Sequence, residues 1–533
     1  MPPTELAHIA ASLKRWLPLA QITLVFLAFG AFFRTAYQLI DPDLWWRIHS
    51  GMDILASGTL PYADSWTWTL PGHPWIEYEW FIDTLYYVGV ANGAWVVLAI
   101  AFAAFALIPF AVWTLRARNF LDLSLVAIGI YLMLPIVGVR PQIVTVTLFF
   151  LLYEFLRARG DRAPDARWTL GAATFFALWA NLHPGFFTGF ALWGLWFLGG
   201  IWEDRLRLRE RFERHAREAL ALGIAFLATF LNPYAHHIHL ETLLALASDP
   251  MHTYIAEWRP PFQYFEPLMP TLVGVAIFLV WKFRTAVRAR ELLILAFFFV
   301  SFVKAARMAP MFLITLLPVL LPMATRARTE ITKIWAAYPP DLGMIRALLF
   351  GAFAAGAFVI VQIASFAALM GAIPYPQGLA AFYESHQIEY AGMRILHPYE
   401  WGGYFGIARN APRVYIDGRM PHWMLPNGDS LLLHSVGFEI GTVAEQREAI
   451  KQLCVEGVVL QKPDALLSRS LFPIFLSLSR DDGRARRIEN IERLQAQGWH
   501  ATYEDDTTML FVAPEDWFTR FPCADDRLLS EKA

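Results

Sequence analysis

Charged residues are scarce in this chain. Aspartate, glutamate, lysine and arginine make up 17% of its 533 residues, whereas about 25% is usual in a soluble protein. Hydrophobic residues make up 56%, and the mean hydropathy is +0.40. Apolar runs of about 20 residues recur, which is the length needed to cross a bilayer core. These features exclude a soluble globular protein, and a net charge of −2 gives no basis for a nucleic-acid partner.

Cysteine is almost absent. The two cysteines, Cys454 and Cys523, fit no zinc-binding or redox spacing. Both fall in a region that the charge distribution places outside the cell membrane, where the oxidising environment permits a disulfide. Burial of Cys454 in an apolar helix is the alternative, and the sequence leaves open whether the two are bonded.

The apolar runs predict an α-helical polytopic membrane protein with about eleven transmembrane helices. We place them at 18–38, 92–115, 120–138, 142–157, 168–181, 185–202, 217–232, 267–283, 291–304, 308–324 and 345–370. The first run is too long for a signal peptide, so it is expected to stay as a helix. The spans define a transmembrane domain at residues 1–372, with a first outward loop at 39–91.

Basic residues orient these spans. The segments assigned to the cytoplasm hold 22 lysines and arginines, and all other residues before 375 hold six. This asymmetry places the N-terminus in the cytoplasm. Eleven crossings then put residues 373–533 on the extracytoplasmic side of the membrane.

The C-terminal segment, residues 373–533, reads as a soluble α/β domain that follows a linker, IPYPQG. Short strands are predicted at Val414–Asp417, Gly457–Leu460 and Thr508–Val512. Helical periodicity covers residues 443–453 and 487–497.

Acidic residues gather in the first outward loop. Asp41 and Asp43 lie in DPDLWW, directly after the first span, and Glu79 lies in PWIEYEW. Carboxylates this close to a bilayer are costly unless they pair, bind a cation or line a wet cavity. We assign Asp43 or Asp41 as a general base, and Glu79 to substrate binding. The two aspartates are also the candidate ligands for a divalent cation, the one cofactor that the loop suggests. The alternative is that Asp41 caps a helix and the tryptophans form an interfacial belt.

Two further outward turns carry candidate phosphate ligands. Arg307 ends the turn Lys-Ala-Ala-Arg between apolar runs, and His183 lies in Asn-Leu-His-Pro-Gly. The planar guanidinium of arginine matches phosphate oxygens in a bidentate way, so a lipid phosphate is a fitting partner. An arginine that snorkels to the membrane surface is the equally weighted alternative.

The C-terminal segment opens with two glycine-containing motifs. In YEWGGYF, paired glycines between Trp401 and Tyr404 permit close approach to a ligand or to another loop. In YIDGRM, Asp417 and Arg419 follow a predicted strand, and ligands often bind at that end of an open sheet. We take all four side chains as candidate substrate-binding residues; a tight turn with an internal ion pair is the alternative for the last two.

Together these motifs resemble the GT-C superfamily of membrane glycosyltransferases, which use polyprenyl-phosphate sugars. The matching stretches are DPDLWWRIHSGMDILASGTLPYADSWTWT, PWIEYEW, NLHPGFF, LNPYAHH, EWRPPF and YEWGGYF with VYIDGR. WGGYF stands where the oligosaccharyltransferase catalytic subunit has Trp-Trp-Asp-Tyr-Gly. The second tryptophan and the aspartate are missing here, so binding of a peptide acceptor does not carry over.

The resemblance implies transfer of a sugar from a polyprenyl-phosphate donor to an acceptor on the outer face of the membrane. Asp43 or Asp41 would accept the acceptor's proton, and Arg307 and His183 would hold the donor phosphate. Membrane lipid is the second expected partner. A lipid-linked sugar transporter or flippase and a non-catalytic assembly protein are the alternative functions. The sugar, the acceptor and the oligomeric state cannot be read from the residues.

Overall fold

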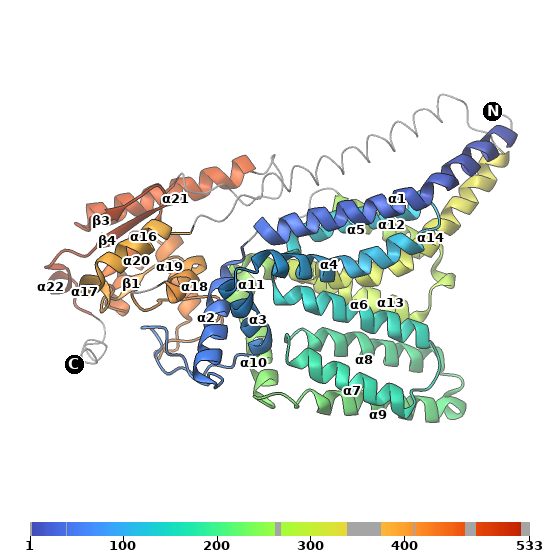
Figure 1. Ribbon diagram of the computed structural model, residues 1–533, viewed down its shortest axis with the longest axis horizontal. Coiled ribbons are helices and arrows are strands. Elements are labelled where there is room, and N and C mark those ends of the chain that lie inside the picture. Colours follow the sequence, from blue (N-terminus) through green and yellow to red (C-terminus); the bar gives the residue numbers. More distant parts are fainter. Residues whose placement is uncertain are drawn as a thin grey trace. The chain divides into compact units, whose positions relative to one another are not determined.

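The computed structural model describes residues 3–38, 40–261, 268–337, 375–408, 411–463 and 476–523. The chain divides into two compact units (Figure 1). The helical unit comprises Met1–Gln38, Val96–Ala235 and Glu257–Met370, and the mixed unit comprises Leu39–Trp95, His236–Ala256 and Gly371–Ala533.

A helix covers each predicted span that falls within the described residues. They are α1 (Pro3–Gln38), α4 (Trp95–Arg116), α5 (Phe120–Met133), α6 (Pro141–Arg159), α7 (Ala166–Ala180), α8 (Phe186–Glu203), α9 (Leu208–Ala228), α12 (Leu268–Lys282), α13 (Ala289–Lys304) and α14 (Ala309–Ala337). Short 3₁₀ turns at Leu134–Ile136, Arg284–Ala286 and Ala306–Met308 connect some of them. The prediction of a helical membrane protein is confirmed.

The predicted number of eleven spans is not confirmed. Among the described residues, four helical stretches are both long and apolar enough to cross a membrane: Arg15–Gln38, Trp95–Arg116, Pro141–Arg159 and Ala306–Ile331. Helices α7 and α12 have 15 residues each, which at 1.5 Å per residue falls short of a core about 30 Å thick. The last predicted span, 345–370, lies outside the described residues.

Ion pairs connect the loop after α6 to three neighbouring helices of the helical unit. The guanidinium of Arg290 donates hydrogen bonds to Glu203 and to Asp161, each at 2.7 Å. Arg214 lies 3.6 Å from the same Asp161 carboxylate. The loop after α6, the end of α8, the first half of α9 and the start of α13 therefore meet. The basic-residue count assigns these parts of the chain to the same side of the membrane.

The mixed unit contains one small sheet and several helices. Strands β1 (Ile395–Leu396), β2 (Gly457–Gln461), β3 (His500–Glu504) and β4 (Thr508–Val512) are arranged in the order β1-β2-β4-β3. Strand β1 pairs with β2 in parallel, and the other pairs are antiparallel. The helices are α2 (Pro42–Ser57), α3 (Trp80–Ala91), α10 (His237–Leu246), α11 (Asp249–Tyr254), α16 (Gln377–Ser385), α17 (Gln387–Tyr390), α18 (Gly402–Ile407), α19 (Leu431–Ile440), α20 (Val443–Gln452), α21 (Leu476–Ala496) and α22 (Trp517–Arg520).

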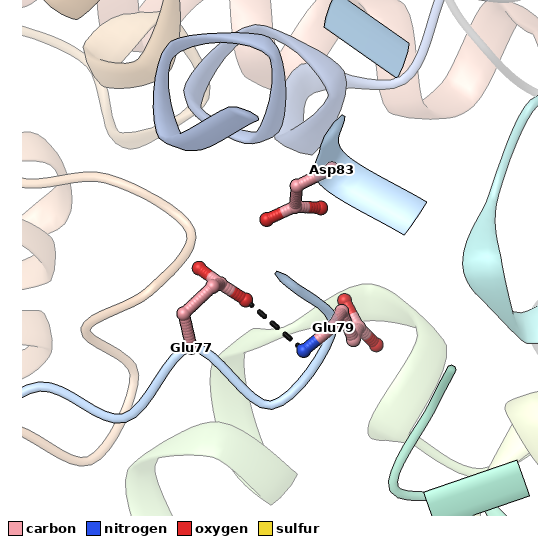
Figure 2. Close-up of side chains that lie close together, drawn as sticks. All are labelled: Glu77, Glu79 and Asp83. Atoms are coloured by element: carbon pink, nitrogen blue, oxygen red, sulfur yellow. Dashed lines mark hydrogen bonds between the residues drawn. The ribbon is translucent and has the colours of Figure 1, made fainter. Parts of the chain in front are cut away.

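Two of the three predicted strands are confirmed, as β2 and β4. The third, Val414–Asp417, is wrong: Val414 forms an isolated bridge with Thr67 of the first outward loop and takes no part in the sheet. Its backbone groups are satisfied by that loop, with the Val414 N–H donating to Trp66 at 3.1 Å. The loop thus folds together with the C-terminal segment in one unit. Within this loop, the Asp83 side chain of α3 points towards Glu77 (Figure 2).

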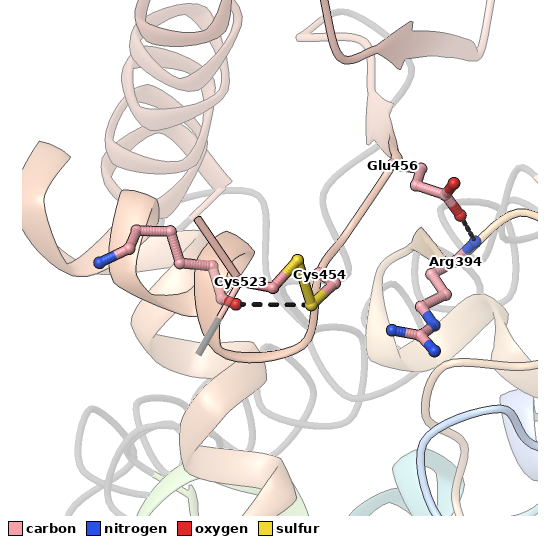
Figure 3. The surroundings of a disulfide bond; sticks show 5 residues. Arg394, Cys454, Glu456 and Cys523 are labelled. Atoms are coloured by element: carbon pink, nitrogen blue, oxygen red, sulfur yellow. Dashed lines mark hydrogen bonds between the residues drawn. A yellow bond between two sulfur atoms is a disulfide. The ribbon is translucent and has the colours of Figure 1, made fainter. Parts of the chain in front are cut away.

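The two cysteines are bonded (Figure 3). Their Cα atoms lie 5.3 Å apart, a separation that a disulfide can span. Cys454 is buried at the end of the turn that follows α20 and has a positive φ of 53°. Beside it, the backbone N–H of Arg394 donates to the carboxylate of Glu456 at 3.0 Å. The bond ties the segment after α22 to the core of the mixed unit.

Two buried histidines make the mixed unit sensitive to acid. His397 accepts a hydrogen bond from the Tyr415 backbone N–H at 3.0 Å, and His434 accepts one from the Tyr415 hydroxyl at 2.6 Å. Burial lowers the pKa of each histidine to about 4. In the unfolded chain each would titrate near 6.5, so between these values the unfolded state binds more protons and stability falls as the pH falls.

We therefore expect the unfolding temperature of the purified protein to fall as the pH is lowered from 6.5 to 4. Each histidine contributes a loss on the order of 3 kcal/mol over that window. Tryptophan fluorescence during heating measures it, with His397→Asn as the comparison. That variant should start less stable and lose less on acidification; an unchanged pH dependence would contradict the role of His397.

Candidate active site

Asp41 and Asp43 lie at the N-terminus of α2. Asp41 is the N-cap residue, and its carboxylate accepts the Asp43 backbone N–H at 2.9 Å. Pro42 follows in the first helical position, so cap and proline together fix where α2 begins. The capping role, one of the two alternatives for Asp41, is confirmed.

Asp43 lies in the first turn, partly exposed, and accepts a hydrogen bond from the Trp46 indole N–H at 3.2 Å. Gly418 lies against this carboxylate: a Cβ there would overlap Asp43 Oδ1 and lie 2.8 Å from the Trp46 indole nitrogen. Glycine in the Asp-Gly-Arg turn is thus required for the C-terminal segment to approach Asp43.

The paired glycines of YEWGGYF serve a contact between segments. A Cβ on Gly403 would lie 2.9 Å from the Trp46 backbone nitrogen, and one on Gly402 would overlap the Ile416 carbonyl. Close approach to another loop, one of the two sequence alternatives, is therefore what these glycines provide. Trp401 is 2% exposed, inside the hydrophobic core of the mixed unit.

Tyr404 forms an aromatic group at the start of α2. Its ring lies 5.1 Å from Trp45, edge to face, and 5.3 Å from Tyr375, stacked. Tyr404 and Trp45 are partly exposed. Two aromatic rings with accessible surface, close in sequence and space to Asp43, suit the apolar face of a sugar ring.

The first outward loop also contains a buried cluster of three carboxylates, which we call the acidic cluster (Figure 2). Its members are Glu77, Glu79 and Asp83. One oxygen of each lies within 4.8 Å of the others, and none is more than 2% exposed. The Glu79 backbone N–H donates to Glu77 at 3.2 Å, and the Ser50 hydroxyl donates to Glu77 at 3.4 Å. The cluster thus joins Glu77 and Glu79, both from PWIEYEW, to Asp83 in the first turn of α3.

Arg47 of α2 reaches into the acidic cluster. It is ion-paired with Glu79 and lies 3.4 Å from Asp83, while its guanidinium covers the Trp46 ring at 4.2 Å. Burial opposes its charge, but the carboxylates of Asp83, Asp43 and Glu77 together raise the pKa of Arg47. Arg47 therefore links the cluster electrostatically to Asp43.

Burial also acts on the carboxylates themselves. It raises the pKa of Glu77 to about 7, partly offset by the charge of Arg47. Burial and the charge of Glu77 raise the pKa of Asp83 as well. Burial and like charge thus favour the protonated form of these carboxyl groups, whereas the guanidinium of Arg47 favours the ionised form.

The acidic cluster is the one group of metal-ligating residues that the described part of the chain brings within reach of a single ion. Asp41 and Asp43, the predicted ligands, are not members of it: one is committed to the helix cap, and the other to Trp46. Three carboxylates have the oxygen ligands that Mg²⁺ or Ca²⁺ prefer. The guanidinium of Arg47, however, already lies where such an ion would bind.

Asp417 and Arg419 form the internal ion pair given above as the alternative to a ligand site. Arg419 lies 2.8 Å from Asp417 and 2.9 Å from Asp64 of the first loop, and all three side chains are at most 1% exposed. The guanidinium stacks on Trp66 at 4.1 Å and on Trp75 at 4.5 Å. These contacts join the first loop to the C-terminal segment.

In the helical unit, two arginines converge on one carboxylate. Arg307 lies 3.5 Å and Arg140 3.7 Å from Glu257, and Gln142 donates to Glu257 at 3.3 Å. The Arg307 guanidinium also covers the Trp258 ring at 4.2 Å. The two guanidinium groups thus lie close to the same carboxylate. Sequence reasoning missed Arg140, although it is one of the six basic residues assigned outside the cytoplasm.

His183 lies in the turn between α7 and α8, where it contacts Thr145 of α6. Its Nδ1 accepts the Gly185 backbone N–H at 2.8 Å and lies 2.9 Å from the Thr145 hydroxyl, which in turn accepts from the Trp179 indole. The imidazole hydrogen is therefore on Nε2. Thr145 lies three residues after Gln142, and side chains three apart on a helix share a face. His183 is 6% exposed, so its orientation is fixed by packing.

No family model matches the chain, and no curated protein matches it. Among solved structures it is similar to the archaeal oligosaccharyltransferase AglB from Archaeoglobus fulgidus, solved in complex with an inhibitory peptide and a dolichol-phosphate. The TM-score is 0.46 and the identity 11%, over 93% of this chain and 74% of that one.

Proposed function

We propose that this protein is a GT-C-type glycosyltransferase that moves a sugar from a polyprenyl-phosphate donor to an acceptor hydroxyl on the outer face of a bacterial inner membrane. The observation that carries the proposal is the convergence of Arg140 and Arg307 on Glu257. Arginine is suited to the oxygens of a phosphate, and two guanidinium groups that lie close together can bind the same phosphate.

The proposed reaction is a substitution at the anomeric carbon. The acceptor oxygen forms a bond to that carbon, the bond from the carbon to the phosphate oxygen breaks, and the lipid phosphate leaves with the bonding electrons. Asp43 takes the acceptor's proton. Arg140 and Arg307 stabilise the charge that develops on the leaving phosphate, and the Nε2–H of His183 serves as a further donor.

The remaining candidates have supporting roles in this proposal. Tyr404 and Trp45 contact a sugar ring. Glu79 acts through Arg47, since the two are ion-paired. Trp401, Asp417 and Arg419 are buried in the mixed unit and hold Gly418 and the first loop in place, so they act on substrate through position.

We expect Arg307→Gln and Arg140→Gln each to raise the KM for the donor about tenfold or more, because a hydrogen bond to a charged group contributes roughly 1.5–3 kcal/mol. Transfer of label from a radiolabelled polyprenyl-phosphate sugar by purified protein measures this. Arg34→Gln is the matched control, since Arg34 is an exposed arginine whose guanidinium donates to Gln38.

An unchanged KM in the double variant Arg140→Gln/Arg307→Gln would remove these residues from the donor site. If the unmodified protein transfers no sugar but moves labelled lipid across vesicle membranes, the transporter would replace the transferase.

A further inference from the structure

Arg47 occupies the centre of an otherwise anionic site. Its guanidinium contacts two members of the acidic cluster, Glu79 and Asp83, and its side chain is 11% exposed. Helix packing holds it there: at Gly51, one turn further along α2, a Cβ would overlap the backbone carbonyl of Asp83 in α3. The two helices therefore approach closely beside Arg47.

Arg47 does not satisfy every carboxylate oxygen of the acidic cluster. Asp83 is fully buried, and in the described part of the chain its Oδ2 atom has no hydrogen-bond partner. In Figure 2 the Asp83 carboxylate faces that of Glu77 across the cluster. Oxygens of all three carboxylates lie within 4.8 Å of one another, so the group retains the oxygens of a cation site even though a side chain fills it.

A guanidinium and a divalent cation compete for this space. A divalent ion bound by Glu77, Glu79 and Asp83 would lie about 2–2.6 Å from an oxygen of each. A cation placed beside the Arg47 guanidinium would be repelled at close range in a site with little solvent to screen the charges. The two therefore exclude one another.

We propose that Arg47 is the built-in cation of the acidic cluster, and that removing its guanidinium converts the cluster into a divalent-metal site. The unmodified protein then needs no metal at Glu77, Glu79 and Asp83. The inference concerns the occupancy of the cluster and does not depend on the proposed sugar transfer.

Electron paramagnetic resonance of Mn²⁺, added alone to the purified full-length protein in detergent, tests this inference. We expect Arg47→Ala to bind one Mn²⁺ at least about tenfold more tightly than the unmodified protein, a difference of about 1.4 kcal/mol. Arg47→Ala/Asp83→Asn should lose the added affinity because one ligand is gone. Arg47→Lys should bind no more tightly than the unmodified protein, since it keeps a positive charge.

Two results would overturn the inference. One is tight Mn²⁺ binding by the unmodified protein that Asp83→Asn abolishes, because the cluster would then hold a metal with Arg47 in place. The other is an Arg47→Ala variant that melts at a similar temperature yet binds Mn²⁺ no better. If Arg47→Ala fails to fold, Arg47→Gln takes its place, because its side chain is uncharged but fills more of the space. Both results are measured as Mn²⁺ binding, so they do not depend on whether the protein transfers sugar.

Discussion

Asp43→Asn is expected to lower the rate of sugar transfer by about 10²–10⁴-fold while the protein folds normally, because this is the usual contribution of a general base. An acceptor hydroxyl is a poor nucleophile at neutral pH, and the amide of asparagine cannot take its proton. The amide retains an oxygen that can accept from the Trp46 indole, as Asp43 does at 3.2 Å. The local structure should therefore survive.

Asp41→Asn is the matched control for this experiment. It removes the same charge two residues away, but asparagine is as good an N-cap as aspartate, so α2 should still begin at Pro42. We expect it to be distinctly milder. Purified variants are compared in transfer from a radiolabelled polyprenyl-phosphate sugar, with thermal melting to verify folding. Should Asp43→Asn transfer at the unmodified rate, the base would be sought in the acidic cluster, where the pKa of Glu77 is raised to about 7.

The secondary structure was predictable wherever a continuous apolar pattern dictates it. The buried central strands β2 and β4 coincide with uninterrupted apolar runs. Strand β3 was missed because it is a largely exposed edge strand, and β1 because it has only two residues. Val414–Asp417 has the composition of a strand, but its pairing partner, Thr67, lies far away in the chain. The composition indicates an extended segment, but it does not indicate which other segment will pair with it.

The candidate site was predictable in its residue types and not in its groupings. DPDLWW identified Asp41 and Asp43, and a local interaction, the helix cap, distinguishes their roles. Arg140 and Arg307 both contact Glu257 because of how the helical unit packs. The spacing of these residues in the sequence does not predict such a contact. Likewise, the sequence singled out the glycines of the C-terminal motifs, but α2 as their partner emerged only from the fold.

Arg419→Met is expected to destabilise the mixed unit by about 3–5 kcal/mol or more, because removing one partner of a buried ion pair leaves uncompensated charge. Here two carboxylates, those of Asp64 and Asp417, would lose their cation, and neither side chain has solvent exposure. Arg419→Lys should recover only part of the loss. A lysine carries the charge, but it cannot reproduce the planar contacts with both carboxylates and with the Trp66 ring.

Denaturant unfolding followed by tryptophan fluorescence measures the effect, and Arg520→Met is the matched control. Arg520 pairs with Asp516 at 3.0 Å, but both side chains are largely exposed, and such surface pairs contribute about 0–1 kcal/mol. Adding Asp64→Asn and Asp417→Asn to Arg419→Met should restore part of the stability, because the unpaired charges are then gone. Equal losses in Arg419→Met and Arg520→Met would contradict the assignment, and the first loop would have to be held to the C-terminal segment mainly by the packing of its tryptophans.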